Sequence, residues 1–359
     1  MFYHRKRNKS EARRNECCQN GNRYATKKIM PVYLIIGTED YIINETKQLL
    51  IDNILEGEEV EFNYANLDLE EMPIEVVIQE AESMPFFGDK RLVMANNPLF
   101  LTTEKSKNKV EHDTAKLEVY LNEPVDYSVL CFVARVEKLD ERKKLTKLLK
   151  KTATVIEAKR PNENELKKWI EAKLSENNMQ MSQEAITRLV ELTSGQLTTA
   201  MNELQKLMLY CFDSKEITIQ DVESLVVRSL EQNIFLLLDK MIAMDISGAL
   251  RIYYDLLKQK EEPIKILALI SSQFRLLNQL KLLEQQGYSQ QQAATKLKVH
   301  PFRVKLASKQ AKNFTELQLN QALKRLAEID LEMKTGFGDK EQKLEWFLFE
   351  LQDNRQKRV

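Results

Sequence analysis

Glycine and proline are scarce in this sequence, which contains nine of the first and eight of the second among its 359 residues. Sandwiches and barrels of β-strands depend on many turns that use these two residues. Their scarcity therefore argues against an all-β fold and favours a helix-rich chain with short connections. Long apolar runs are also missing: none reaches the ~20 residues that a membrane-spanning helix requires, so we expect no membrane partner.

Cysteine and histidine are too few and too scattered for a metal centre. The four cysteines form no CxxC pair, and no cysteine stands at metal-ligand spacing from a histidine. We therefore expect neither a disulfide framework nor a zinc site. These residues are Cys17, Cys18, Cys131 and Cys211, with His4, His112 and His300.

Neither sign of charge is in excess, since Lys+Arg and Asp+Glu number 54 each. Bulk charge therefore does not indicate a nucleic-acid or membrane partner, and any such contact has to come from local patches. Apolar residues make up 43% and charged residues 30%, which is typical of a soluble globular protein. A chain of this length is too long for one ordinary domain, and we expect two or three.

Residues 1–29 differ from the rest, with nine Lys or Arg against two Glu and no apolar segment that would resemble a secretory signal. One interpretation is a basic arm for nucleic acid. The other is a disordered extension, or a start codon placed too far upstream. The lack of any periodic pattern favours the second.

Residues 30–160 alternate between short apolar runs and segments of helical spacing. This alternation predicts an α/β domain with a parallel five-stranded sheet and a layout like that of nucleotide-binding domains. The strands are expected at 31–37, 60–67, 91–97, 127–136 and 152–158, and the helices at 40–55, 73–84, 112–124 and 140–151.

After residue 160 the strand pattern stops, and two all-α domains are predicted. Residues 161–229 hold three or four short helices, one beginning at Ser182 and another at Thr218 or Asp221, which are typical capping residues. Residues 230–359 form a longer helical bundle interrupted by single prolines and glycines, among them Pro263, Gly287, Pro301 and Gly336.

A nucleotide-binding layout calls for a phosphate loop after the first strand, and none is present. The segment "GTEDYIINE" at 37–45 lacks Gly-Lys-Ser/Thr. Glu39, Asp40 and Glu45 bring negative charge to the place where phosphates would lie, so Coulomb repulsion disfavours ATP. The third strand ends in "MANNP", without an acid to hold Mg²⁺. We predict no cofactor, no metal and no catalytic residue.

The stretch "SMPFFGDKRLVMANN" at 83–97 places Phe86 and Phe87 between Pro85 and Gly88, in a setting that predicts a surface turn. Consecutive residues of an extended segment point in opposite directions, so at least one ring is hard to bury. Either the two rings pack under the helix and at the strand entry, or they form an exposed anchor for a partner. The residues alone favour neither.

Residues 289–311 have the spacing of a helix-turn-helix, and the second helix carries Arg303, Lys305 and Lys309. A DNA-binding regulator would place that helix in a major groove. The alternative is a short helix pair inside a larger bundle. The long helices predicted on both sides favour the bundle.

The order of these parts resembles the delta-subunit family of the bacterial DNA polymerase III clamp loader. The resemblance runs from about Pro31 to Leu351. It rests on several segments: "VYLIIGTEDYIINE", "SMPFFGDKRLVMANN", "VEKLDERKKLTKLLKK", "SGQLTTAMNELQKL", "HPFRVKLASKQAKNF" and "AEIDLEMKTG".

The resemblance implies a degenerate AAA+-like domain, a helical lid and a helical collar in a cytoplasmic subunit of the DNA polymerase (nucleotidyltransferase) holoenzyme that does not hydrolyse ATP. Such a subunit binds and opens the sliding clamp (beta subunit) through a hydrophobic plug, for loading onto primed DNA. Met84, Phe86 and Phe87 match that plug by position, although family members often carry a Leu-Phe pair there.

The resemblance also implies partners. The collar packs with the tau/gamma and delta prime subunits around primer–template DNA, for which Arg303, Lys305 and Lys309 are candidate contacts. Members usually begin near the first strand, so the basic extension of residues 1–29 departs from the family.

Overall fold

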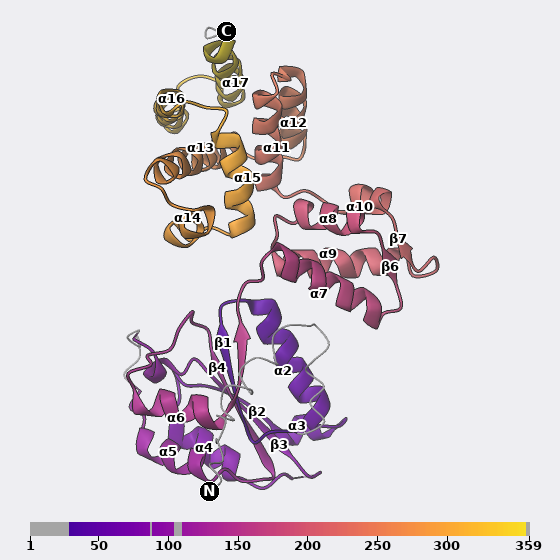
Figure 1. Cartoon of the computed structure of the whole chain (residues 1–359), viewed down its shortest axis with the longest axis vertical. Coiled ribbons are helices and arrows are strands. Elements are labelled where there is room, and N and C mark those ends of the chain that lie inside the picture. Colours follow the sequence, from indigo (N-terminus) through magenta and orange to yellow (C-terminus); the bar gives the residue numbers. More distant parts are fainter. Residues whose placement is uncertain (1–28, 87, 104–109, 357–359) are drawn as a thin grey trace, which may run out of the picture. The chain divides into compact units, whose positions relative to one another are not determined.

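The computed structural model describes residues 29–86, 88–103 and 110–356. Its chain divides into two compact units (Figure 1). The first holds the chain up to Pro161 together with Glu171–Asn177, and the second holds Asn162–Ile170 and everything from Asn178 onward. The predicted extension, apart from Ile29, lies outside the described residues.

The first unit is built on a five-stranded parallel sheet with the strand order β2-β3-β4-β1-β5. All of β1 and β4 is buried, as expected for parallel strands with helices on both faces. The predicted fold class is thus confirmed. The strands are β1 Val32–Gly37, β2 Tyr64–Asp68, β3 Arg91–Asn96, β4 Ser128–Ala134 and β5 Thr154–Ala158.

Helices cover the sheet on both sides, with α2 on one face and α4, α5 and α6 on the other (Figure 1). Alternate residues of β1, Val32, Leu34 and Ile36, pack into the core formed with α4 to α6, which is the period of two expected of a strand. The helices are α2 Asp40–Ile54, α3 Glu59–Asn63, α4 Ile74–Glu82, α5 Thr114–Asn122 and α6 Lys144–Thr152, with a 3₁₀ turn at Leu99–Leu101.

One predicted strand was wrong in its first half. Residues 60–67 were expected to be extended, but Glu59–Asn63 form the short helix α3 and the strand begins at Tyr64. The alternation of Val60, Glu61, Phe62 and Asn63 imitates a strand over only four residues. Acidic residues in the first turn of α3 favour the helix instead, through the helix dipole.

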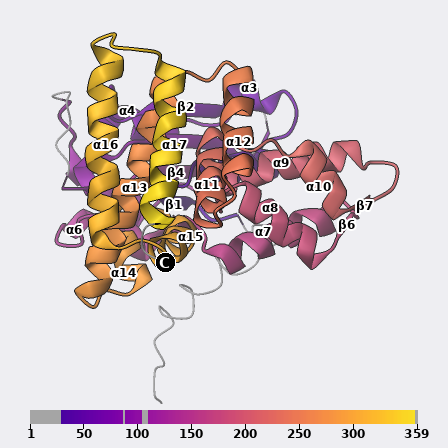
Figure 2. The ribbon, with the colours of Figure 1, turned by 90° about the horizontal axis from the view of Figure 1, so that it is seen from above.

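The second unit is mainly helical, and an apolar core extends through α11 to α17. Figure 2 shows α13, α16 and α17 side by side. The helices are α7 Glu163–Glu176 (whose last residues belong to the first unit), α8 Gln183–Leu192, α9 Leu197–Tyr210, α10 Ile219–Leu225, α11 Leu230–Ile242, α12 Ile246–Lys258, α13 Pro263–Gln285, α14 Gln290–Leu297, α15 Pro301–Ala311, α16 Glu316–Lys334 and α17 Lys340–Gln356.

The predicted helix starts in this unit hold. The Ser182 hydroxyl accepts the Ala185 N–H at the start of α8, and Thr218 and Asp221 form a capping box on α10. A two-stranded parallel pair, β6 Gln180–Met181 with β7 Glu216–Ile217, was not predicted, because two residues are too few to show alternation. The division of this unit near residue 230 stays a prediction.

Candidate functional site

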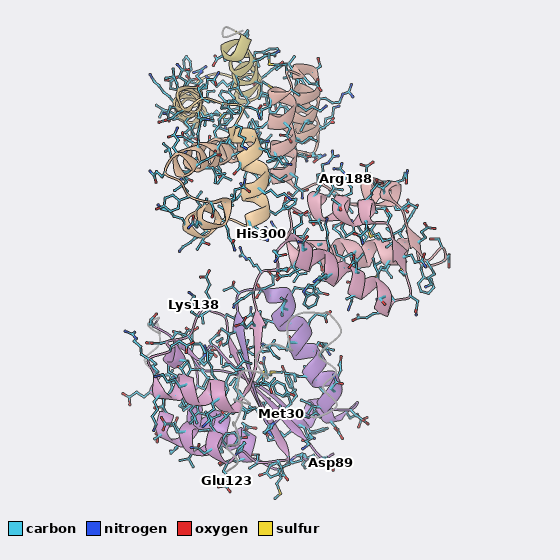
Figure 3. The ribbon with its side chains drawn as sticks, viewed as in Figure 1. Met30, Asp89, Glu123, Lys138, Arg188 and His300 are labelled. Atoms are coloured by element: carbon cyan, nitrogen blue, oxygen red, sulfur yellow. The ribbon has the colours of Figure 1, made fainter. Side chains whose placement is uncertain are left out.

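The candidate site is the segment between α4 and β3, residues 83–90, called the tip below. In a parallel sheet, a segment that enters a strand lies at the edge formed by the amino ends. Figure 3 shows this arrangement: Asp89 and Glu123, before β3 and β4, lie at one end of the first unit, and Lys138, after β4, lies at the other. Nucleotides bind such sheets at the carboxyl ends, so the tip is on the opposite edge.

Two apolar side chains of the tip project into solvent. Met84 is 77% exposed and Phe86 is 70% exposed. The interpretation that Phe86 packs under the helix therefore does not hold. Phe87, the third residue predicted for this site, lies outside the described residues. Large apolar side chains that are exposed together are typical of a contact surface for a partner.

Helix α3 forms the base of the tip. The ring of Phe62, itself 47% exposed, lies 5.5 Å from the ring of Phe86 between centroids. The Phe86 backbone N–H donates to Oδ1 of Asn63 over 2.8 Å. Sequence reasoning missed Phe62 because it assigned this segment to a strand. The available signal was an apolar side chain in an otherwise acidic stretch.

Both ends of the tip are tied to the first unit. On the helix side, the Tyr127 hydroxyl donates to the Glu82 carbonyl over 2.8 Å. On the strand side, Arg91 forms an ion pair with Glu80 and donates to the Phe62 carbonyl over 3.4 Å. Gly88 has a φ of +72°, a left-handed conformation that glycine adopts without strain.

The opposite edge lacks the geometry of a phosphate site. The N–H of Glu39, just before α2, donates to the Ala158 carbonyl over 3.0 Å and is not available to a phosphate. The Glu39 side chain is largely buried there, and Asp40 is held in an ion pair by Arg135. Helix N-termini bind phosphate through free N–H groups and positive potential, and this N-terminus carries two acids.

Titration of ATP and Mg²⁺ into the purified chain is expected to give no heat of binding. Glu39 repels the phosphates, its N–H is already bonded to the Ala158 carbonyl, and no lysine follows a glycine at this turn to compensate. Isothermal calorimetry would measure this, with a phosphate-loop ATPase as the positive control. Saturable binding by the folded chain would contradict the prediction.

Within the described ranges, no cluster of His, Cys, Asp and Glu is arranged to hold a metal ion.

The predicted helix pair at 289–311 exists as α14 and α15, and it is part of the bundle. Helix α15 buries Phe302, Val304 and Ala307 against the rest of the second unit. The predicted interpretation as a pair inside a larger bundle therefore fits the structure.

Two of the three basic residues on α15 form ion pairs within the second unit. The Arg303 guanidinium lies 3.2 Å from the Glu231 carboxylate, and the Lys305 ammonium lies 2.7 Å from Glu163. The hydrogen bond from Lys305 lowers the pKa of the Glu163 carboxyl, which favours its charged form. A DNA phosphate would have to compete with these carboxylates.

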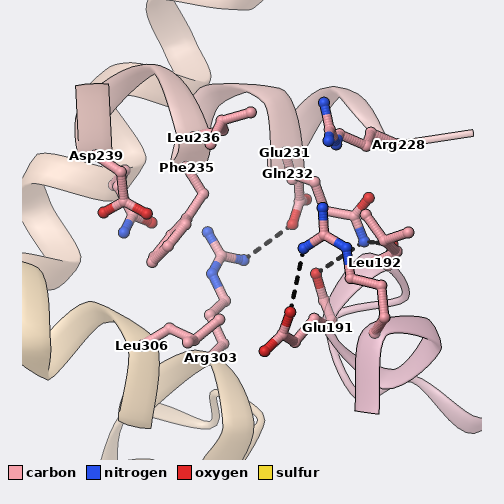
Figure 4. A pocket seen from close by; sticks show the side chains of 13 residues that line it. Glu191, Leu192, Arg228, Glu231, Gln232, Phe235, Leu236, Asp239, Arg303 and Leu306 are labelled. Atoms are coloured by element: carbon pink, nitrogen blue, oxygen red, sulfur yellow. Dashed lines mark hydrogen bonds and ion pairs between the residues drawn. The ribbon is translucent and has the colours of Figure 1, made fainter. Parts of the chain in front are cut away.

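Arg303 also lines a pocket of about 170 Å³ formed by α8, α11, α13 and α15. Figure 4 shows its guanidinium directed at Glu231. In the same lining, the Arg188 guanidinium lies 3.2 Å from the carboxylate of Glu191, which is three positions later on α8. Burial raises the pKa of Asp239 in the same wall. The lining contains as many carboxylates as guanidiniums, three of each, so it offers no excess positive charge for a phosphate.

Replacing both Arg303 and Lys305 with alanine is expected to leave binding of duplex DNA by the isolated chain unchanged within about twofold, because both charges are already neutralised by neighbours. Fluorescence anisotropy with duplexes of several sequences measures this, with Arg275→Ala as a matched substitution elsewhere in the bundle. A large loss together with base preference would revive the DNA-binding regulator.

Comparison with known proteins assigns the chain to a family. The DNA polymerase III subunit delta of Bacillus subtilis (strain 168) is 47% identical over 330 residues, which cover 92% of this chain and 95% of the relative. The chain belongs to the DNA polymerase III delta subunit family. A probable delta subunit from Aquifex aeolicus (strain VF5) is 25% identical over 88% of this chain and 90% of its own length.

Family models and a solved structure agree with this membership. The model for DNA polymerase III, delta subunit matches residues 33–159, a middle-domain model matches 162–224, and the model for the C-terminal domain of the DNA polymerase III delta subunit matches 231–351. The Bacillus subtilis DNA clamp loader delta protein superposes with a TM-score of 0.77, at 47% identity, and the match covers 90% of this chain and 96% of that one. The tip thus lies in the first of these matches and α15 in the C-terminal domain match.

None of the helices in the described part of the chain is long and apolar enough to cross a membrane.

The two described cysteines, Cys131 and Cys211, are free and buried, and burial raises the pKa of the Cys131 thiol to about 12. A thiol with so high a pKa stays protonated and is a poor nucleophile or metal ligand at neutral pH.

Proposed function

We propose that this chain is the subunit of a DNA polymerase III clamp loader that binds the sliding clamp and opens it, without hydrolysing ATP itself. The observation that carries the proposal is the pair of exposed apolar side chains, Met84 and Phe86, on a tip fastened to helix α3. Membership of the delta subunit family supplies the setting. In this proposal Met84, Phe86 and Phe87 enter an apolar pocket on the clamp.

The two edges of the sheet then have different roles. The carboxyl edge keeps the layout of a nucleotide-binding domain but has acids at its first turn, so the energy of ATP is supplied by other subunits. The amino edge carries the tip. Clamp binding opens the ring only if the chain binds the open form more tightly than the closed form, because a ligand shifts an equilibrium by its differential affinity.

The remaining parts fit the same assembly. We propose a lid at 161–229 and a collar at 230–359, the collar packing with tau/gamma and delta prime subunits around primer–template DNA in the cytoplasm. Lys309, Arg303 and Lys305 are proposed DNA contacts only within that complex, where a phosphate can share the existing ion pairs. The match of the C-terminal domain model to residues 231–351 supports a separate collar.

The first test is surface binding of the chain to the sliding clamp of the same organism. Saturable binding is expected, together with separation of two dyes placed on either side of one clamp interface. A folded chain that does not bind the clamp would overturn the proposal. Binding without separation of the dyes would retain clamp binding and remove the opening role.

A further inference from the structure

The side chain of Asn63 is completely buried, at the end of the five-residue helix α3. A buried amide has to be hydrogen-bonded, since leaving it unsatisfied is unfavourable. Its oxygen accepts the backbone N–H of Phe86, which is 23 positions later in the sequence. This hydrogen bond therefore joins a buried point inside the first unit to an exposed part of the tip.

The same short helix meets the tip at two further positions. The ring of Phe62, next to Asn63, contacts that of Phe86. Glu59, one turn earlier, lies so close to Gly88 that a Cβ there would be 2.0 Å from the Glu59 carboxylate. Phe86 and Gly88 are thus both in contact with α3, while the Met84 and Phe86 side chains stay exposed.

We infer that Asn63 is a positioning residue for the contact made by the tip: its buried amide fixes the backbone at Phe86, so that Met84 and Phe86 are presented in one conformation before the partner arrives. The expected effect on clamp affinity rests on the proposed function, whereas the effect of Asn63 on the conformation of the tip does not. A preorganised tip spends less binding free energy on ordering itself. A tip that reaches the competent conformation only part of the time binds with an affinity reduced by that fraction.

The test compares Asn63→Leu, which is similar in size and cannot accept a hydrogen bond, with Asn63→Asp, which keeps an acceptor oxygen. Chymotrypsin, which cleaves after accessible aromatic residues, reports how loosely the tip is held without any partner. Clamp binding on a surface then reports the consequence. Thermal unfolding controls for the fold, and kinetics are normalised to the active fraction.

We expect Asn63→Leu to be cleaved faster in the tip and to bind the clamp on the order of 10-fold more weakly. The loss should lie mainly in the association rate, because the contacts made after binding are unchanged. Asn63→Asp should restore part of both properties, because it keeps the acceptor oxygen but brings a charge into a buried site. A variant that only destabilised the fold would show cleavage throughout the chain and no rescue.

Equal cleavage of the tip and equal affinity in folded Asn63→Leu would overturn the inference. If Asn63→Leu does not fold, Phe62→Ala decides. This substitution removes a half-exposed ring that contacts Phe86. Faster cleavage of the tip than in the wild type supports the inference that α3 holds the tip. Cleavage at the wild-type rate overturns it. If the wild-type chain does not bind the clamp but Asn63→Leu is cleaved faster, the proposed function fails and the positioning of the tip stands.

Discussion

Replacing Phe86 with alanine is expected to weaken binding of the chain to the sliding clamp by about 10- to 150-fold. Phe86 is 70% exposed in the free chain, so most of its apolar surface is still available for burial by a partner. Fully burying a phenylalanine contributes roughly 1.5–3 kcal/mol, which corresponds to that range of dissociation constants. Surface binding with the wild-type chain as reference measures the effect, and circular dichroism checks folding.

Phe337 offers a matched control, because it is 72% exposed but lies in the second unit. Phe337→Ala removes a ring of similar exposure and should leave the affinity for the isolated clamp unchanged.

Replacing Phe86 and Phe87 together should reduce the free energy of clamp binding by about 3–6 kcal/mol, if each ring is buried by the clamp. Equal binding by wild type and Phe86→Ala would place the clamp contact elsewhere on the chain.

Replacing Gly37 with alanine is expected to destabilise the first unit by roughly 2–5 kcal/mol, through backbone strain and overpacking together. Gly37 has a φ of +148°, and a Cβ there would lie 2.0 Å from the Ala158 carbonyl oxygen of the neighbouring strand β5. A backbone atom cannot rotate away as a flexible side chain can. The midpoint of unfolding should fall by roughly 5–15 °C.

The measurement can separate the two units of the chain. Both tryptophans, Trp169 and Trp346, belong to the second unit, so tryptophan fluorescence follows that unit while circular dichroism follows both. Gly57→Ala is the matched control, since Gly57 has a φ of +51° but no atom within 4 Å of an added Cβ. Its cost should be only about 1 kcal/mol, from strain alone. Equal effects of the two substitutions would show that the clash with β5 is relieved at no cost.

Sequence reasoning predicted the sheet well because its signal is local. The strands β1, β3 and β4 are runs of mostly buried apolar residues, and β1 at Val32–Gly37 is typical. The error at α3 arose where the local signal was weakest, over four alternating residues. The pair β6 and β7 escaped notice for the same reason, since neither strand is long enough to have a period.

The candidate site could be located from the sequence but not built from it. A turn with adjacent aromatic residues was recognisable at Phe86, but its contacts with Phe62 and Asn63, which are more than 20 positions earlier, were not. The ion pairs of the basic residues on α15 could not be predicted from the sequence either. The partners of Arg303 and Lys305 lie 72 and 142 positions away, and no local pattern could reveal them.

The parallel sheet also allows the two edges of the first unit to be engineered independently of each other. Segments that enter strands gather at one edge and segments that leave them at the other, so the tip and the first turn at Glu39 lie at opposite edges of the sheet. Substitutions at the two edges should therefore act additively on stability. A designer could graft a different recognition segment between α4 and β3, or restore a phosphate loop after β1, and treat each as an independent replacement.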